Sequence, residues 1–207
     1  MLYWLARGLI RLLAGVFLRW EIEGAENLPS EGPVLLAINH LSAFDPLLGG
    51  SAVNRKVHFM AKEELFRSPL LAALLRRLGA FPVRRGESDR QALRQALRLL
   101  EQGEVVGIFP EGTRSPDGRL QQAQTGLAFL AQRARAAVVP MAILGSRGLL
   151  SGFLRPGKVR IVIGQRVYAP EGGEDDSAHE RHRRFADEVM GRINALLAAA
   201  EEARKGR

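Results

Sequence analysis

The stretch PVLLAINHLSAFDPLL, residues 33–48, joins an apolar run to a polar loop and a helix start. Residues 33–38 form a short continuous apolar segment, which is typical of a strand buried on both faces. Asn39 and His40 follow at once. Asp45 and Pro46 then match a helix start, with aspartate as the N-cap and proline in the first helical position. A strand that leads through a loop into a helix indicates an α/β fold.

Six further apolar segments have the length and the β-branched or aromatic content of strands. They are WEIEG (20–24), KVHFMA (56–61), GAFPV (79–83), VVGIFP (105–110), AAVVPMAIL (136–144) and KVRIVIG (158–164). Between them lie helical patterns. Ser88 and Gln91 stand at capping-box spacing, and Ser177 and Glu180 open a C-terminal helix in the same way. The alternation predicts one α/β domain with a mixed or largely parallel sheet flanked by helices.

The composition sets the broad class of protein. A length of 207 residues suits a single domain, and 46% hydrophobic with 25% charged residues is ordinary for a globular chain. The net charge of +8 predicts attraction to anionic partners such as nucleic acid, a membrane surface or an acidic carrier. The chain contains no cysteine, which excludes disulfides, thiolate nucleophiles and cysteine-ligated metals. No metal-binding or cofactor-binding motif is found, so we expect neither a metal nor a cofactor.

The first segment, MLYWLARGLIRLLAGVFLRW, is apolar but is interrupted by Arg7, Arg11 and Arg19. Arginines near the middle make a membrane-spanning helix costly, and the absence of a small-residue cleavage site disfavours a secretory signal. An amphipathic helix in the membrane interface fits better, with its arginines toward lipid phosphates and its large apolar side chains among the acyl chains. The alternative is a helix packed on the protein's own core. We expect residues 1–19 to form a membrane-binding helix.

Two predicted strands end on reactive residues, and in α/β sheets the loops after strands line the ligand crevice. Strand 33–38 ends at His40, and strand 105–109 ends next to Glu111. A histidine takes and returns a proton near neutral pH, and a carboxylate such as Asp45, brought back by a turn, can orient it. From this pair alone, a structural histidine and a helix-capping aspartate are the favoured interpretation, because such pairs arise easily by chance. Ser42 lacks a nucleophile-elbow sequence and is assigned to the turn.

The segment FPEGTRSPDG, residues 109–118, has the features of an anion-binding loop. Gly112 allows the backbone to approach a ligand, Thr113 supplies a hydroxyl, and Arg114 supplies a planar fork suited to phosphate. A polar hairpin with a solvated arginine is the alternative. Glu111 fits such a pocket if it orients an arginine or accepts a hydroxyl. The arginines of 68–86 form either a solvated basic face or a second membrane-contacting surface.

Four blocks in this order resemble the glycerolipid acyltransferase family, in particular its bacterial 1-acylglycerol-3-phosphate acyltransferases. NHLSAFD (39–45) is similar to the family's N-H-x4-D block, GAFPVRR (79–85) to the second block, FPEGTRS (109–115) to the third and VVPMAI (138–143) to the fourth. Order and spacing agree over residues 20–165. The resemblance implies the family's α/β fold, with the acyltransferase domain at 20–207 after the helix at 1–19.

The resemblance also implies direct acyl transfer without an acyl-enzyme. His40, oriented by Asp45, would deprotonate the free hydroxyl of 1-acylglycerol-3-phosphate, which then attacks the thioester of acyl-CoA or acyl carrier protein to give phosphatidic acid. No metal or cofactor is needed, and the protein would lie peripherally on the cytoplasmic face of the inner membrane. The residues implied for the acceptor's phosphate are Arg85, Glu111, Gly112, Thr113 and Arg114; Pro140 is implied on the donor side, and Asn39 and Ser42 in support.

Two positions depart from the family pattern. Gln124 stands where a lysine is frequent, and Arg84 stands where an acidic residue often precedes the arginine of the second block. An acyltransferase for another lysolipid or lipid acceptor is therefore the first alternative. The second is a catalytically inactive peripheral protein that binds anionic lipid. Nucleic-acid binding has no motif to support it, and aromatic residues make up 6% of the chain.

Overall fold

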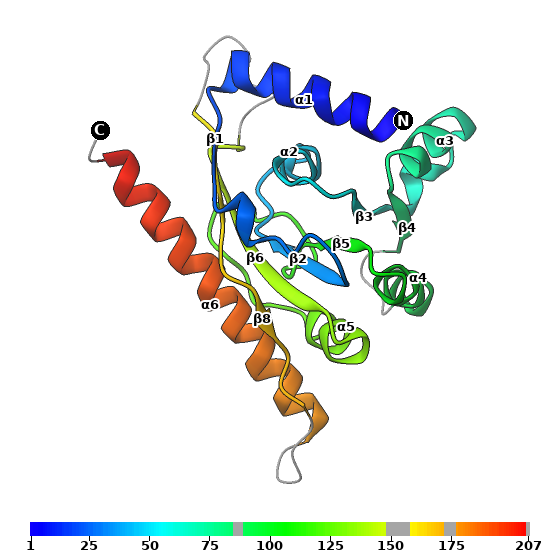
Figure 1. Ribbon diagram of the computed structural model, residues 1–207. Coiled ribbons are helices and arrows are strands. Elements are labelled where there is room, and N and C mark those ends of the chain that lie inside the picture. The colour runs from blue at the N-terminus through cyan, green and yellow to red at the C-terminus, as the bar shows by residue number, and fades with distance from the viewer. Residues whose placement is uncertain (85–88, 148–157, 172–176, 206–207) are drawn as a thin grey trace.

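The computed structural model describes residues 1–207 except 85–88, 148–157, 172–176 and 206–207. Its described strands form an eight-stranded sheet in the order β1-β7-β6-β2-β5-β3-β4, and β8 pairs with β6 beside that path (Figure 1). The strands are β1 (Glu21–Glu23), β2 (Val34–Ile38), β3 (Val57–Lys62), β4 (Phe81–Val83), β5 (Val105–Ile108), β6 (Ala137–Leu144), β7 (Arg160–Ile163) and β8 (Val167–Tyr168).

The described helices are α1 (Leu2–Leu18), α2 (Asp45–Ala52), α3 (Pro69–Arg77), α4 (Arg90–Glu101), α5 (Gly126–Ala134) and α6 (Ala178–Lys205). Two 3-10 turns, η1 (Ala25–Asn27) and η2 (Glu63–Phe66), precede β2 and α3. All seven segments expected to be strands are strands. The sequence patterns missed β8, whose two residues are too few to show a period.

The sheet is mixed and largely parallel, as predicted. Strand β2 lies at its centre and pairs in parallel with β5 and with β6. Strands β7 and β8 run antiparallel to β6, and β1 runs parallel to β7. The carboxyl ends of β2, β3, β4, β5 and β6 therefore meet at one edge, where the polar residues after β2 and β5 come together.

Helices cover both faces of the sheet. On β2, Leu35 and Ala37 face a core shared with α4, α5 and α6. The alternate residues Val34, Leu36 and Ile38 face a second core, which α1 and α2 complete. All five side chains are fully buried, which explains why the sequence of β2 is a continuous apolar run and not an alternating one.

Two of the predicted helix starts are tested by the structure. At α6, the Ser177 hydroxyl accepts from the Glu180 amide, and the Glu180 carboxylate accepts from the Ser177 amide, so the predicted capping box is confirmed. At α4 the predicted cap was wrong by one residue, because the Asp89 carboxylate accepts from the amides of Gln91 and Ala92. Ser88 itself lies outside the described residues.

Helix α1 packs on α2 through its polar side. Arg7 donates to the carbonyl of Val53, and Arg11 donates to the carbonyl of Ser51. These carbonyls lie at the C-terminal end of α2, where backbone oxygens lack partners within the helix. The expectation that Arg7 and Arg11 point toward lipid phosphates was therefore wrong, because the carbonyls of α2 bind them.

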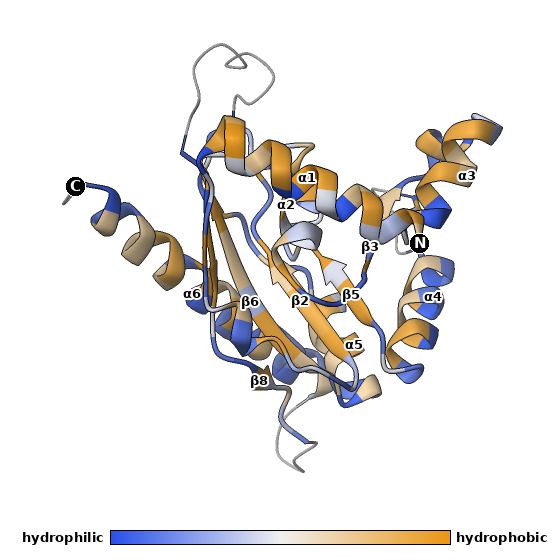
Figure 2. Cartoon of the chain, turned by 45° about the horizontal axis from the view of Figure 1, so that its top comes forward, coloured by the Kyte–Doolittle hydropathy of each residue, from blue (hydrophilic) through white to orange (hydrophobic). Residues whose placement is uncertain are grey.

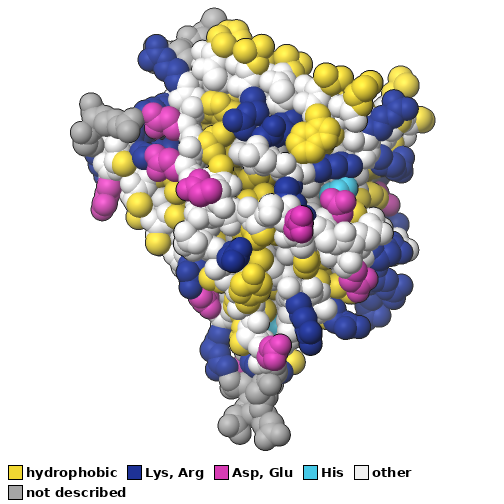
Figure 3. Space-filling view, in the orientation of Figure 1, with side chains coloured by type: hydrophobic (Ala, Val, Ile, Leu, Met, Phe, Trp, Pro, Cys, Tyr) yellow, Lys and Arg dark blue, Asp and Glu magenta, His cyan; other side chains and the backbone are white. Residues whose placement is uncertain are grey.

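The apolar side of α1 consequently faces outward (Figure 2). Its exposed large side chains are Leu2, Trp4, Leu5, Leu9, Leu12, Leu13, Val16 and Phe17. Figure 3 shows hydrophobic side chains along the same edge of the molecule, over α1. No helix in the described part of the chain is long and apolar enough to cross a membrane.

Candidate active site

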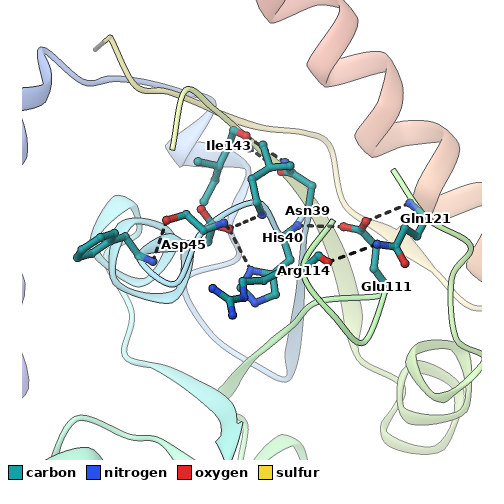
Figure 4. Close-up of polar contacts among 10 residues, drawn as sticks. Asn39, His40, Asp45, Glu111, Arg114, Gln121 and Ile143 are labelled. Carbon is teal, nitrogen blue, oxygen red and sulfur yellow. Dashed lines mark hydrogen bonds and ion pairs between the residues drawn. The ribbon is translucent and has the colours of Figure 1, made fainter. Parts of the chain in front are cut away.

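His40 and Asp45 meet in the loop between β2 and α2. The sheet fixes the start of this loop, and the first turn of α2 returns the carboxylate toward β2 (Figure 4). Nδ1 of His40 lies 3.0 Å from Oδ2 of Asp45, with 5% of the histidine side chain and none of the aspartate side chain exposed. This geometry favours the tautomer in which Nδ1 carries a proton for Asp45. Nε2 has no hydrogen-bonding partner among the described residues, so its lone pair is available as a base.

Asp45 does not cap α2 in the predicted way. The N-cap is Phe44, and no side chain accepts from the first amides of the helix. Oδ2 of Asp45 instead accepts from the amides of Leu41 and Ser42, each at 2.6 Å, as well as facing His40. The carboxylate therefore holds the whole loop closed around the histidine. Ser42 lies in this loop, as expected, and its hydroxyl accepts from the amide of Phe44.

The ring of His40 stacks on Phe109. The ring centroids are 3.9 Å apart with an angle of 18° between the planes, and Phe59 stacks behind Phe109 with centroids at 5.9 Å. Phe109 follows β5 directly, so the neighbouring strand supplies a flat apolar support for the imidazole. No sequence pattern indicates this support, because Phe109 continues the apolar run of β5.

Glu111 fixes the backbone on which His40 sits. Its Oε1 accepts from the amide of His40 at 2.9 Å, and its Oε2 accepts from the amide of Gln121 at 3.0 Å (Figure 4). Glu111 is 4% exposed, so its carboxylate is buried and both oxygens have protein partners. The structure thus gives Glu111 a contact to the loop of His40, where the sequence pattern predicted a contact to phosphate.

Asn39 links the same loop to β6. Its side-chain amide donates to the carbonyl of Ile143 at 3.0 Å and accepts from the amide of Ile143 at 2.7 Å. Asn39 is fully buried, and its side chain extends the hydrogen bonding between β2 and β6 past the last paired residues. The supporting role predicted for Asn39 thus has a defined contact.

The predicted anion loop follows β5 and lies beside His40. Thr113 and Arg114 are exposed, whereas the buried Ser115 is bound into its own turn, with its hydroxyl accepting from the amide of Gly118. The amide of Ser115 donates to the carbonyl of His40 at 2.9 Å, which joins the two loops. Figure 4 shows the side chain of Arg114 extending in the direction of His40.

The position of Gly112 leaves no room for a side chain. Its φ of +71° is left-handed, and a Cβ atom there would lie 2.1 Å from Nε2 of Gln124. Gln124 therefore packs on the anion loop. A cavity of about 670 Å³ opens at this point and is lined by Phe109, Gly112, Gln124 and Arg84 among others. Its volume is within the range of small-molecule sites.

The remaining predicted site residues lie elsewhere. Arg85 is outside the described residues, and its neighbour Arg84 forms an ion pair with Glu63 at 2.8 Å. Pro140 lies within β6, opposite Ala37 of β2, although a proline pattern alone predicts a strand edge. It is tolerated there because β6 pairs with β8 at 137–138 and with β7 from Met141, so Pro140 lies between the two partners.

The described residues contain no group of three or more histidine, aspartate or glutamate side chains arranged to hold a metal ion. The polar groups around His40 are the carboxylate of Asp45 at its ring, the carboxylate of Glu111 at its backbone amide, and several backbone amides. Together with the imidazole, these groups can accept a proton and hold the ring in orientation, which general-base catalysis requires.

Comparison with known proteins places this site in a family. The sequence profile of the family described as Acyltransferase matches residues 19–144. The chain belongs to the acyltransferase family. The matched span contains β2 through β6 and every described residue of the site above.

Named relatives agree with this assignment. The acyltransferase is 33% identical over 182 residues to the 1-acyl-sn-glycerol-3-phosphate acyltransferase of Bacillus subtilis, covering 85% of this chain and 87% of that protein. It is 30% identical to the chloroplastic LPAT1 of Arabidopsis thaliana, covering 84% of this chain and 50% of that protein. The crystal structure of the 1-acyl-sn-glycerophosphate acyltransferase PlsC from Thermotoga maritima superposes with a TM-score of 0.73 at 28% identity, covering 95% of this chain and 80% of that one.

Proposed function

We propose that this acyltransferase moves a fatty acyl group from a thioester donor to the free hydroxyl of 1-acylglycerol-3-phosphate, with His40 as general base. The observation that carries the proposal is the buried contact of 3.0 Å between His40 and Asp45, which leaves Nε2 available. The names of the relatives in Bacillus subtilis and Thermotoga maritima support this acceptor. Acyl-CoA and acyl carrier protein both present the required thioester.

The reaction begins with removal of the hydroxyl proton by Nε2 of His40. The acceptor oxygen attacks the thioester carbonyl, the carbon–sulfur bond of the resulting tetrahedral intermediate breaks, and the imidazolium returns its proton to the thiolate. The new bond is the ester of phosphatidic acid, and the donor leaves as a free thiol. A thioester is already activated, so a base and correct positioning are the main requirements.

Asp45 acts through His40. Its negative charge stabilises the imidazolium, which is present during the transfer and absent before it. The charge therefore lowers the activation barrier and leaves the substrate affinity unchanged. The amides of Leu41 and Ser42 hold the carboxylate in place. Glu111 and Asn39 position the loop through the contacts described above and do not touch the reacting atoms.

The acceptor's phosphate is assigned to the loop after β5. Arg114 is exposed and extends toward His40, and Gly112 and Thr113 precede it on the same loop. Arg85, which lies outside the described residues, keeps its predicted role as a second positive contact. Gln124 packs on Gly112 and takes the position at which the family often carries lysine, which favours testing other lysolipid acceptors beside lysophosphatidate.

Residues 1–19 are assigned to membrane binding, with 20–207 as the catalytic domain. Because Arg7 and Arg11 bind α2, the outward side of α1 is apolar, with Leu9 56% and Leu12 64% exposed. Exposed apolar side chains on one helix face are the feature by which a helix inserts into the acyl boundary of a bilayer. An acceptor that resides in the bilayer requires such contact, and a peripheral position at the cytoplasmic face gives access to either donor.

The test of catalysis uses purified protein with lipid vesicles, acyl-CoA and 1-acylglycerol-3-phosphate. The wild type should form phosphatidic acid, and His40→Ala should abolish the activity while the circular dichroism spectrum is kept. Substantial activity in this variant would refute the base assignment. A folded wild type that is inert with a panel of lysolipids and both donors would indicate the inactive lipid-binding alternative.

Membrane binding is tested with Leu9→Glu/Leu12→Glu. Both side chains are exposed, so the fold should survive while flotation with vesicles is strongly reduced. Tyr168→Glu on β8 is the control, because it replaces another large exposed side chain, 59% exposed, on an element that does not contribute to this surface. Equal flotation of the wild type and the α1 variant would exclude α1 as the anchor.

A further inference from the structure

A second cavity, of about 660 Å³, lies between α4 and the segment from η2 to β4. Most of the charged side chains in its lining are cationic. Figure 3 shows Lys and Arg side chains gathered on the same flank, below the apolar edge formed by α1. The charged and titratable residues that line the cavity are Arg76, Arg84, Arg94, Arg98, His58, Glu63 and Asp89.

The two carboxylates of this cavity already have partners within the protein. Glu63 is ion-paired with Arg84, and Asp89 accepts from the backbone amides of Gln91 and Ala92 and from that of Arg84. Within the described part of the chain, no carboxylate forms an ion pair with the other three arginines of the lining. The three side chains are exposed; Arg98 donates to the side-chain oxygen of Gln95, and Arg76 lies over the ring of Phe66. The cavity therefore has an excess of positive charge.

The arrangement on α4 is not explained by helix stability. Gln91, Arg94, Gln95 and Arg98 recur at the spacing that places side chains on one helix face, and all four line the cavity. Arg94 and Arg98 stand four residues apart, where like charges destabilise a helix. A helix face of two arginines and two amides without an acidic residue is suited to bind phosphate oxygens and a polar group attached to them.

This basic cavity adjoins the one that opens beside the reaction site. Both are lined by Val83, Arg84, Asp89 and Ala92. The other cavity reaches Phe109, on which the ring of His40 stacks. One extended ligand can therefore occupy both cavities, with a phosphate on α4 and its other end near the base.

We propose that the basic cavity binds the phosphate of the acyl donor's phosphopantetheine end, whereas the acceptor's phosphate binds beside His40. This inference rests on the proposed function. In the acceptor, the reacting hydroxyl and the phosphate are on neighbouring carbons, so that phosphate must lie close to the base. In the donor, the long pantetheine arm separates the phosphate from the thioester, so its phosphate needs a site away from the base. The shared arm is found in coenzyme A and in carrier protein.

The first experiment measures binding without catalysis. 4′-Phosphopantetheine, the part that coenzyme A and carrier protein share, is titrated by calorimetry into the full-length protein. We expect Arg94→Gln/Arg98→Gln to weaken binding by about tenfold or more, since each lost charge-assisted contact is a large share of a phosphate site. The control Arg192→Gln/Arg204→Gln removes the same charge from exposed positions on α6 and should bind like the wild type. Equal binding by the two double variants would overturn the proposal.

The second experiment compares the two donor sources in the acyl-transfer assay. The α4 variant should raise KM for the donor about tenfold while KM for the lysolipid and kcat at saturating donor stay near wild type. A rise with both donors supports the shared phosphopantetheine phosphate, whereas a rise with acyl-CoA alone would assign the cavity to the nucleotide and overturn the proposal. A rise in KM for the lysolipid in place of the donor, or no rise at all, would refute the inference.

These outcomes separate the inference from the proposed function. If the wild type transfers acyl groups and the α4 variant equals it with both donors, the donor site is wrong and the general-base mechanism is unaffected. If the wild type binds 4′-phosphopantetheine through α4 but transfers no acyl group, the proposed reaction fails while the phosphate site stands.

Discussion

Replacing Asp45 by asparagine tests the proposed catalytic pair more sharply than removing His40. Asparagine keeps the shape of the side chain but removes the negative charge that faces the imidazolium. Two unit charges 3.0 Å apart attract by about 5 kcal/mol at an effective dielectric constant of about 20. If that attraction acts in the transition state and not in the ground state, its loss lowers kcat by about 10³ to 10⁴. KM for either substrate should change little.

The same substitution has a calculable effect on folding. Oδ1 of Asp45 is buried and has no hydrogen-bonding partner within the described structure, while Oδ2 accepts from two amides and faces His40. An asparagine oxygen can replace Oδ2, but its amino group then occupies the buried site of Oδ1 without an acceptor. An unsatisfied buried donor costs about 1–3 kcal/mol. Urea unfolding should therefore show a less stable variant that still folds.

The assay is kcat at saturating donor and lysophosphatidate, with Asp187→Asn as the control. Asp187 is exposed on α6, so this control makes the same chemical change at a distance from the site. The double variant His40→Ala/Asp45→Asn should be no slower than His40→Ala, because the aspartate acts through the histidine. A folded Asp45→Asn protein with kcat within about tenfold of wild type would refute the assigned role.

Three further predictions concern groups around the site, each measured by urea unfolding. Glu111→Gln should lose about 1–3 kcal/mol, because one amide oxygen cannot serve both amides that the carboxylate serves; unchanged stability would contradict this. Gly107→Ala should lose about 1–3 kcal/mol, because its Cβ would lie 2.2 Å from the ring of Phe59; a neutral effect would mean that Phe59 can move freely. Hydrogen bonds from the backbone, first that of Arg84, hold the pKa of Asp89 below its usual 3.8, so its stabilisation is present above that pH and lost as pH falls through the lowered pKa. Asp89→Asn keeps a cap that does not titrate and should be less sensitive to acid than the wild type; equal sensitivity would contradict the assignment.

The fold was predictable because its strands are short apolar runs punctuated by glycine and proline. The alternation of these runs with helices gave the class, and the full burial of β2 on two faces explains its uninterrupted apolar sequence. The order of strands was not predictable in the same way. It depends on which apolar faces meet, as in the pairing of β2 with β6 across about a hundred residues, and no local pattern encodes that choice.

The site was predictable where chemistry is local and unpredictable where it depends on distant partners. His40 and Asp45 are five residues apart, so a turn between them was a natural expectation. The contact between Glu111 and the amide of His40 joins two loops 71 residues apart, and a carboxylate at the end of a strand does not reveal that its partners are backbone amides. For the same reason the arginines of α1 were assigned to lipid, because their acceptors are carbonyls that a sequence does not display.

The positions of these contacts on α2 link the proposed membrane-binding helix to the proposed catalytic pair. Asp45 begins this helix, and Ser51 near its end supplies the carbonyl that receives Arg11 from α1. A helix of eight residues is about 12 Å long. The helix α2 therefore holds Asp45 and the apolar face of α1 a short, fixed distance apart. If α1 binds the membrane as proposed, a lysolipid whose acyl chain stays in the bilayer can present its hydroxyl to His40 without leaving the membrane. A long flexible linker in place of the arginine contacts between α1 and α2 would lose that alignment.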